Sequence, residues 1–308
     1  MESVDEVDRG LIHALHLDGR APFAAIAAVL GVSENTVARR YRRLRQAGVM
    51  RVVGSANGLL IGRPSWTVRI RCTPDVAPPV AAALARRPDT FWVHILSGGT
   101  EISCNLQSTD TAARDALLMD KLPRSTRVLD VSAHAVLGGV ATEWAGIRHL
   151  TEAQAARLTP EPPAEEPLTL DGDDHALLAA LARDGRTPYT ELGQSESAAR
   201  RRVTRLRRAG VLVLDLDVLP AALGYHAEAR LWLTVRPTGL AATAAAVAAH
   251  PETSFTAVTT GRTNLVATVI CRDSADLYRY LTERVGTLDD VHTVETAPLM
   301  RTVKRAAS

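Results

Sequence analysis

Two short segments of the chain concentrate arginine, a side chain that can hydrogen-bond a phosphate group through two parallel N–H donors. Five arginines fall within residues 39–45 and six within residues 200–208. A helix that carries so many like charges repels itself unless an anion compensates them. Phosphates supply that charge, so the two segments predict contacts with a nucleic acid. The alternative is a solvated arginine face in a chain whose basic residues are nearly all arginine.

Short polar residues come directly before each arginine segment. Ser33 can cap a helix that begins at Glu34, and Ser195 has the matching place before the second segment. Such side chains reach base edges when the N-terminus of a helix enters the major groove. The predicted DNA-binding residues are therefore Ser33, Glu34, Asn35, Thr36, Arg39, Arg40 and Arg43, together with Ser195, Ser197, Arg200, Arg201 and Arg205.

The arginine segments recur because the sequence is doubled. Residues 39–49 and 201–211 are identical at eight of eleven positions, and residues 15–23 and 181–189 at five of nine. The offset falls from 166 to 162 residues between these two matches, so the second copy lacks four residues there. A weaker match between the copies then continues at an offset of 163 residues through the rest of each copy. The segment 159–167, rich in proline and glutamate, is typical of a linker between the copies.

Each copy begins with a helical pattern. In the first copy, apolar residues spaced by three and four predict helices within residues 7–17, 23–30 and 34–47. The apolar stripe of the third helix faces inward, so most of its arginines are expected to point outward or sideways. Three short helices with a tight turn before the third predict a helix-turn-helix domain. Short extended stretches are expected at 49–53 and 59–61.

The remainder of each copy follows the order β-α-β-β-α-β, which is that of the ferredoxin-like fold. The predicted fold class is α+β, with two copies of a winged helix-turn-helix domain followed by a ferredoxin-like βαββαβ domain. The face of each sheet that its helices leave uncovered needs a partner, and the two halves of the chain can cover each other as an intramolecular pseudo-dimer. The expected strands are 66–72, 90–96, 101–107 and 127–136 in the first copy and 227–235, 254–258, 265–271 and 291–299 in the second, with helices at 76–86, 111–121, 240–250 and 274–285.

Five segments follow from this organisation. We expect an N-terminal helix-turn-helix domain at 1–62, a first βαββαβ domain at 63–150 and a linker at 151–169. A second helix-turn-helix domain, shortened by the four missing residues, is expected at 170–222, and a second βαββαβ domain at 223–308. The missing residues fall in the second helix and its turn, where their loss can tilt or disable the domain.

The sequence resembles the Lrp/AsnC family of bacterial transcription regulators, also called feast/famine regulators. The resemblance implies a cytoplasmic regulator that binds double-stranded DNA and a small-molecule effector such as an amino acid. It implies that the βαββαβ parts are ligand-sensing (RAM) domains, and that pseudo-dimers can assemble into larger homo-oligomers. It is carried by the spacing of Asp8, Leu11, Ile12, Leu15 and Asp18-Gly19-Arg20, by SENTVARRYRRLRQAGV at 33–49, and by ETAPLMRTVKR at 295–305.

The resemblance also implies an effector site at the loop between the second and third strands of each βαββαβ domain. In the family this loop usually carries a glycine followed by an aspartate that helps to hold an amino acid. Glu101 keeps an acid at this place in the first copy, whereas Asn264 does not in the second. The alternative is a tight turn in which glycine supplies a positive φ. The implied effector-binding residues are Gly98, Gly99, Thr100, Glu101, Gly261, Arg262, Thr263 and Asn264.

Several other kinds of protein are not expected. The three cysteines are far apart, so neither a disulfide framework nor a cysteine-based metal site is predicted, and no motif indicates a cofactor. The first ten residues are acidic, unlike a signal peptide, and no apolar run is long enough to span a membrane. The net charge of +2 argues against DNA only as a sum over the whole chain, because the arginines are clustered.

An enzyme on the same architecture is the alternative function. The tandem arrangement resembles that of sirohaem decarboxylases, which need acid–base and propionate-binding groups, typically histidine and arginine. The nine histidines do not pair between the copies, and His94 is expected to be structural. The arginine-rich third helices would have no reason to persist in such an enzyme. The chain is therefore expected to be a regulator and not an enzyme; a sensor whose second helix-turn-helix domain is inactive is a further alternative.

Overall fold

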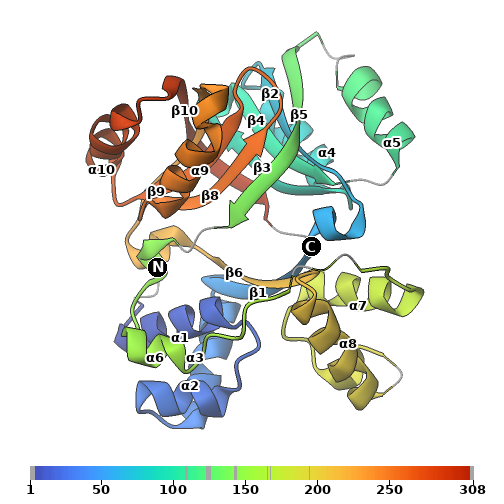
Figure 1. Cartoon of the computed structure of the whole chain (residues 1–308), viewed down its shortest axis with the longest axis vertical. Coiled ribbons are helices and arrows are strands. Elements are labelled where there is room, and N and C mark those ends of the chain that lie inside the picture. Colours follow the sequence, from blue (N-terminus) through green and yellow to red (C-terminus); the bar gives the residue numbers. More distant parts are fainter. Residues whose placement is uncertain are drawn as a thin grey trace. The chain divides into compact units, whose positions relative to one another are not determined.

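The computed structural model describes residues 4–107, 110–122, 126–141, 144–164, 166, 168–193 and 195–305. The chain divides into two compact units. The first unit contains Met1–Gly62 and Ile147–Leu223, and so joins the two helix-turn-helix domains. The second contains Arg63–Gly146 and Gly224–Arg305, and so joins the two βαββαβ domains (Figure 1). No helix in the described part of the chain is long and apolar enough to cross a membrane.

The first helix-turn-helix domain has the three predicted helices. Helix α3 begins after Ser33, whose Oγ accepts a hydrogen bond from the Thr36 amide at 3.1 Å, and Gly31 supplies the left-handed turn before it. The stretch expected to be extended at 59–61 is instead a 3₁₀ turn, because the side chain of Asn57 caps it through the Leu59 amide. The elements are α1 (Glu6–Leu17), α2 (Phe23–Leu30), α3 (Glu34–Gln46) and β1 (Met50–Ala56).

The second helix-turn-helix domain keeps the first and third helices and loses the second. Its elements are α7 (Gly172–Arg183), α8 (Glu196–Arg208) and β6 (Leu212–Val218). A single 3₁₀ turn at Tyr189–Glu191 stands where the first copy has α2. The four-residue deletion therefore falls where the repeat alignment predicts it.

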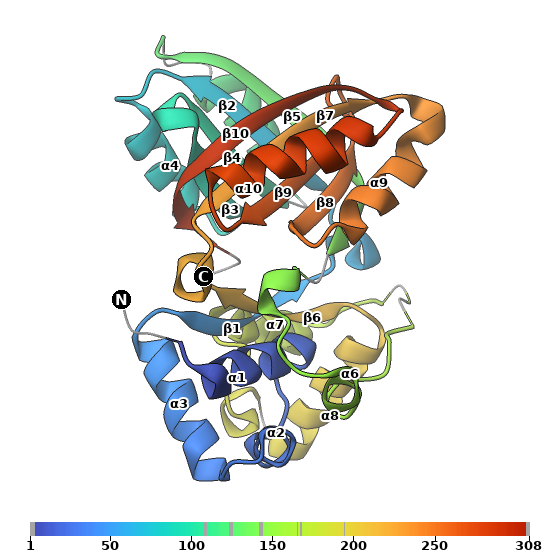
Figure 2. The ribbon, with the colours of Figure 1, turned by 90° about the vertical axis from the view of Figure 1, so that its left-hand side faces the viewer.

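The two helix-turn-helix domains pair with each other inside the first unit. Strands β1 and β6 form an antiparallel pair from Met50↔Val218 to Ala56↔Leu212, and the helices of both domains lie on the same side of it (Figure 2). Arg20 Nη1 donates to the Gly185 carbonyl, and Arg186 Nη1 donates to the Gly19 carbonyl, both at 2.8 Å. These reciprocal contacts relate the domains by an approximate two-fold axis.

The segment that contains residues 149–154 packs on the first helix-turn-helix domain. It contains a short helix, α6 (Glu152–Ala156), which Thr151 caps. Gln154 Nε2 donates to the Val29 carbonyl at 3.0 Å, and His13 Nδ1 accepts from the amides of His149 and Leu150. The beginning of the expected linker is thus tied to α1 and α2.

The second unit is a closed eight-stranded barrel in the order β10-β3-β4-β2-β5-β8-β9-β7. The helices of each copy lie on its outside (Figure 1). The first copy supplies β2 (Ser65–Cys72), α4 (Ala77–Ala85), β3 (Thr90–Leu96), β4 (Glu101–Gln107), α5 (Thr111–Asp115), extended by a π-helical turn, and β5 (Val128–Ala141). The second supplies β7 (Ala227–Val235), α9 (Leu240–Ala249), β8 (Thr253–Thr259), β9 (Leu265–Cys271), α10 (Ser274–Arg279), also continued by a π-helical turn, and β10 (Val291–Lys304).

The barrel closes where the last strand of each copy reaches the other copy. Strand β5 is longer than the predicted 127–136, and its residues Val136–Ala141 pair with β8. Strand β10 is longer than the predicted 291–299, and its residues from Leu299 to Lys304 pair with β3. Each sheet thus covers the open face of the other within one polypeptide.

The outer face of the barrel strands is apolar, whereas the inner face carries both apolar and charged side chains. On β2, Val68 and Ile70 pack with the helices of the first copy, and on β7, Leu231 and Leu233 pack with those of the second. Because successive side chains of a strand point to opposite faces, the residues between them point into the barrel. That interior holds both an apolar cluster, which includes Leu96 and Trp232, and several buried charged groups.

Candidate nucleic-acid interface and barrel interior

A buried carboxylate fixes the arginine-rich helix of the first domain. The side chain of Asp8 on α1 is fully buried and forms ion pairs with Arg40 and Arg43 of α3. The Arg40 contact is 3.0 Å long, and Arg40 also pairs with Asp5. These contacts pull one side of α3 onto α1.

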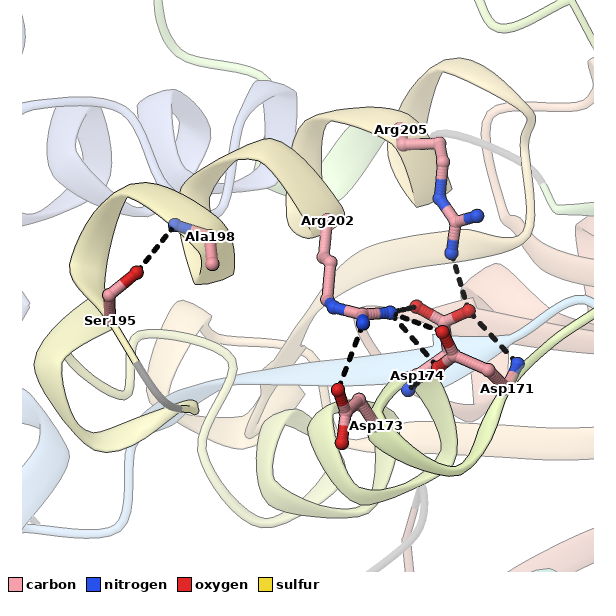
Figure 3. A network of polar contacts seen from close by, with 7 residues as sticks. All are labelled: Asp171, Asp173, Asp174, Ser195, Ala198, Arg202 and Arg205. Carbon is pink, nitrogen blue, oxygen red and sulfur yellow. Dashed lines mark hydrogen bonds and ion pairs between the residues drawn. The ribbon is translucent and has the colours of Figure 1, made fainter.

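The second domain repeats this arrangement. Figure 3 shows Arg202 and Arg205 of α8 pointing to the first turn of α7, where Asp171, Asp173 and Asp174 lie. Asp174 is buried like Asp8, and Arg202 Nη1 lies 2.9 Å from its Oδ1. The paired residues differ by 166 positions on the acidic side and by 162 on the basic side, so the ion pairs survive the deletion between them.

The ion pairs perturb the acids at the start of α7. Burial alone would raise the pKa of Asp174, but hydrogen bonds from Arg205, the Asp171 amide and Arg202 outweigh it and lower that pKa. Hydrogen bonding to Arg202 is the main reason that the pKa of Asp171 is also lowered. Both groups are therefore held in the charged form.

Other arginines of the clusters join the two domains. Arg45 of α3 pairs with Asp184 of the second domain, and Arg207 of α8 pairs with Asp18 of the first. Arg200 pairs with Glu196 on its own helix at 2.9 Å and lies over the Tyr189 ring.

Four of the eleven cluster arginines form no ion pair with another described residue: Arg39, Arg42, Arg201 and Arg208. The self-repulsion that suggested phosphates in the sequence is thus largely compensated from inside the protein. The expectation that these helices keep their arginines only for DNA is wrong, because four of them hold a third helix onto the first helix of its own domain and two join the domains.

The remaining predicted DNA-binding residues lie on the exposed side of the third helices. Ser33, Glu34, Asn35 and Arg39 are exposed at the start of α3, and Thr36 is partly buried. Ser195, Ser197 and Arg201 are exposed on α8. By contrast, Arg40, Arg43, Arg200 and Arg205 are engaged in the ion pairs described above.

The exposed side of α8 borders a groove of about 980 Å³. The groove is lined by residues of α8, among them Arg201 and Arg208, and by Ala164, Glu166 and Leu168 of the segment between the copies. The Ala164 amide donates to the Arg208 carbonyl at 2.8 Å. An acidic residue, Glu166, thus lines the same groove as the arginines of the second domain.

The two loops implied as effector sites are tight turns. Gly98, Gly99 and Gly261 have φ values of 69°, 90° and 100°, which supports the turn alternative. A Cβ at Gly261 would lie 2.1 Å from His134 Nδ1, so this loop packs directly on β5. Thr100 and Arg262 are exposed, and Gly99 and Thr263 are partly buried.

The acid and the amide of these loops both have hydrogen-bond partners on neighbouring strands. Glu101 is 5% exposed and accepts hydrogen bonds from Arg69 and from Trp232 Nε1, each at 3.0 Å. The side chain of Asn264 bonds to both the amide and the carbonyl of Val235 at 2.8 Å. Neither side chain is therefore free of protein contacts.

A buried arginine in the barrel interior was missed from the sequence. Arg230 on β7 is 3% exposed and donates to Thr268 Oγ1 at 2.8 Å, but no carboxylate of the described residues lies within ion-pair distance. Burial lowers its pKa to about 10, so the side chain stays protonated at neutral pH. An arginine in the middle of the apolar stretch AEARLWLTV was the available signal.

His94 lies in the same interior. It is 7% exposed, and its Nδ1 lies 3.2 Å from Thr302 Oγ1. Burial, followed by the charges of Arg230 and Arg305, holds its pKa well below the usual range, so the imidazole is neutral. Among the described residues, no group of three histidine, cysteine or acidic side chains is arranged to hold a metal ion.

Solved structures share the fold of the whole chain. The sirohaem decarboxylase NirDL matches with a TM-score of 0.63 at 15% sequence identity, over 98% of this chain and 93% of that one. The structure of NirDL with an iron-uroporphyrin III analogue matches equally well. The prediction that the chain is not an enzyme is therefore corrected, because the architecture that was taken to indicate a regulator is also that of an enzyme.

Sequence comparisons indicate the family. A profile of the AsnC-type helix-turn-helix domain matches residues 4–45 and 170–207, and one of the Lrp/AsnC ligand binding domain matches residues 228–308. An uncharacterised HTH-type transcriptional regulator of Pyrococcus abyssi is 30% identical over 141 residues, which are 44% of this chain and 89% of that protein. The regulatory protein AsnC of Escherichia coli is 29% identical over 150 residues, with 44% and 96% covered. Each relative thus corresponds to about one copy of the repeat, and the chain belongs to the Lrp/AsnC family of transcriptional regulators as a tandem form with two helix-turn-helix domains.

Proposed function

We propose that this chain is a sequence-specific, DNA-binding transcriptional regulator whose two helix-turn-helix domains contact one DNA site. One observation carries the proposal. Arg39 and Arg201 occupy equivalent exposed positions of α3 and α8 and have no ion-pair partner among the described residues, whereas their neighbours anchor each helix from behind. Two unpaired guanidinium groups on paired, rigidly held helices suit phosphate or guanine contacts.

The ion pairs prepare the third helices for this role. Asp8 and Asp174 fix the rotation of each helix, so the N-terminal polar residues and the free arginine keep a defined direction. Because β1 and β6 join the domains, the site is expected to contain two half-sites about one helical turn, roughly 34 Å, apart. The half-sites differ, because Arg42 of α3 corresponds to Thr204 of α8, so a perfect palindrome is not expected.

Selection of bound sites from random double-stranded DNA tests the proposal, repeated with Arg39→Ala and Arg201→Ala. Each change is expected to cost about 1–3 kcal/mol if the arginine reads a base, or to reduce the salt dependence by about one unit if it contacts a phosphate. Arg183→Ala is the matched control, because it removes one exposed arginine from α7 without touching a third helix. Loss of binding with the control but with neither test variant would contradict the proposal.

We further propose that a small-molecule effector, such as an amino acid, binds to the βαββαβ domains of a cytoplasmic protein. Binding there would change how the helix-turn-helix domains engage DNA or how pseudo-dimers assemble. Arg262 and Thr263 are the loop side chains best suited to meet such a ligand, since Glu101, Asn264 and the Thr100 hydroxyl already have partners.

A second candidate function is decarboxylation of a tetrapyrrole of the uroporphyrin type, as the whole-chain fold of NirDL suggests. The buried charge of Arg230, without a carboxylate partner and beside the neutral His94, favours it. Arg230 would pair with a substrate carboxylate, because the buried carboxylate of Glu101 already bonds to Arg69 and Trp232. Binding of iron-uroporphyrin III that is lost in Arg230→Gln, together with release of CO₂, would support this candidate. No binding to the wild-type protein would exclude it.

A further inference from the structure

The groove of about 980 Å³ beside α8 follows one face of that helix from its first turn to its last. Residues spaced by three and four positions along a helix share a face, and the lining residues of α8 include Ser197, Arg201, Thr204, Arg205 and Arg208. Ser197 and Arg201 are among the exposed residues proposed to contact DNA. The groove therefore runs along the surface with which the second helix-turn-helix domain is proposed to meet DNA.

A segment from between the two copies shares this groove. Three of its described residues line the groove together with α8 and are here called the strap: Ala164, Glu166 and Leu168. The Ala164 amide donates to the Arg208 carbonyl at 2.8 Å, and the Leu168 amide donates to the Leu60 carbonyl at 3.4 Å. The Leu168 side chain is half-buried against the core of the second helix-turn-helix domain. The strap is thus tied to the last turn of α8 and to the core beneath it.

The strap carries a charge of the same sign as DNA. Residues 159–167 contain three glutamates, four prolines and no basic residue, so the segment is acidic and a helix is not expected there. Glu166 is exposed and forms no ion pair with another described residue. Phosphate groups that approach this face of α8 would meet the Glu166 carboxylate beside the arginines, and like charges repel each other.

The same inter-copy segment treats the first helix-turn-helix domain differently. The hydrogen bonds that tie residues 149–154 to that domain end on α1 and α2, at His13 and Val29. Arg39 and Arg42, on the exposed side of α3, form no hydrogen bond or ion pair with the described residues of this segment. In the described part of the chain, the strap therefore distinguishes the second domain from the first.

We propose that the strap is autoinhibitory, and that a DNA duplex must displace it before α8 can bind. The inference rests on the proposed function, because it concerns the same surface of α8. The strap is held by a backbone hydrogen bond to the helix and by one half-buried leucine side chain, so it can leave while α8 stays folded. The first domain then binds DNA without hindrance, whereas the second binds only when phosphates compete successfully with the strap.

The DNA affinity of the full chain tests the proposal, measured by fluorescence anisotropy with a labelled pool of random-sequence duplexes. Glu166→Gln removes the charge of the strap at an exposed position. It is expected to tighten binding about threefold at low salt, because one partly screened repulsion is lost. Glu161→Gln is the matched control, since it makes the same change in the same segment at an exposed residue that does not line the groove. It is expected to leave the affinity unchanged.

Two further measurements connect the gain to α8. The gain from Glu166→Gln should persist when Arg39 and Arg42 of α3 are both replaced by alanine, and disappear when Arg201 and Arg208 of α8 are. Hydrogen exchange at the Ala164 amide gives a readout that does not depend on charge. The duplex is expected to accelerate this exchange, because displacement of the strap breaks the bond to the Arg208 carbonyl.

Three results would overturn the inference. They are equal effects of Glu166→Gln and Glu161→Gln, a gain that survives the loss of Arg201 and Arg208, and slower exchange at Ala164 when the duplex is present. Failure of the strap is distinguishable from failure of the regulator proposal. A wild-type chain that selects DNA sites but gains nothing from Glu166→Gln contradicts the strap alone. A duplex that binds neither the wild type nor Glu166→Gln contradicts both, and one that binds only Glu166→Gln supports both.

Discussion

Arg45 Nη2 on the first helix-turn-helix domain lies 2.7 Å from Asp184 Oδ2 on the second, and Arg207 and Asp18 repeat this contact in the opposite direction at 2.8 Å. The two third helices thus each lend one arginine to the junction between the domains. Because these residues come from α3 and α8 themselves, the junction connects the position of the domains to the surface proposed to meet DNA.

The contribution of this junction to stability is expected to be small. Arg45 is about half exposed, and ion pairs of this kind contribute about 0.2–1 kcal/mol because water screens them. A double-mutant cycle with Arg45→Ala and Asp184→Ala, followed by urea unfolding, should give a coupling energy in that range. A coupling of zero would mean that the Arg45–Asp184 pair adds nothing to the β1–β6 pairing and the Arg20, Arg186 and Arg207 contacts that also join the domains.

Asp174 should matter much more. Asp174→Asn leaves Arg202 and Arg205 without their buried partner and weakens the capping box of α7, so we expect a loss of about 3 kcal/mol in the free energy of unfolding of the first unit. Asp173→Asn is the control, because Asp173 is exposed and pairs only at the surface. Equal effects of the two changes would show that burial of the acid is unimportant.

The same acids predict acid sensitivity. The pKa values of Asp171 and Asp174 are lowered in the folded protein, so their stabilisation is present above the unfolded value near 4 and is lost as pH falls through the folded value. Thermal melts between about pH 5 and 2 should therefore converge for the wild type and Asp174→Asn.

Asp215 behaves in the opposite way. Burial, and then the charge of Asp217, raises its pKa, although Ser55 donates a hydrogen bond to it. A raised pKa means that the protonated form is favoured in the fold, so the stability linked to this group falls as pH rises through the folded value. Asp215→Asn should raise the melting temperature at pH 7 and have little effect in acid, with Asp290→Asn, a surface ion-pair acid of the second unit, as the control. A lower melting temperature at pH 7 would contradict this account.

Arg230 is expected to lower the free energy of unfolding of the barrel. Its buried charge has no carboxylate partner, so Arg230→Met, which keeps most of its volume, should raise the free energy of unfolding by about 1–4 kcal/mol. The comparison is Arg69→Met, which should destabilise the barrel because Arg69 bonds to Glu101 and Glu295. If Arg230→Met also destabilised the barrel, the residue would be structural and the tetrapyrrole candidate would lose its support.

The predictable part of the fold is the part set by local sequence. Helices α2 and α3 lie where apolar spacing, Gly31 and Ser33 put them. The ends of β5 and β10 were not predictable, because the residues beyond Val136 and Leu299 are fixed by pairing with the other copy. The prediction that residues 59–61 are extended was wrong, because the side chain of Asn57 caps a 3₁₀ turn there.

The candidate site shows the same division. The sequence revealed that arginines cluster on the third helices, but not that Asp8, 32 residues before Arg40, lies buried beneath them. It also indicated an acid at 101, but the partners of that acid, Arg69 and Trp232, come from β2 and from the other copy. Long-range pairing therefore decided which charged residues remain free.

The closure of the barrel by one polypeptide has a genetic consequence. A ring built from two identical subunits must carry every substitution twice, so a change that benefits one half is imposed on the other. Here Asp89 and Glu252 are encoded separately, and they differ: Arg87 bonds to both oxygens of Asp89, whereas Arg284 pairs with one oxygen of Glu252. Fusion thus frees each half to specialise, with their one-to-one ratio guaranteed by translation of a single message.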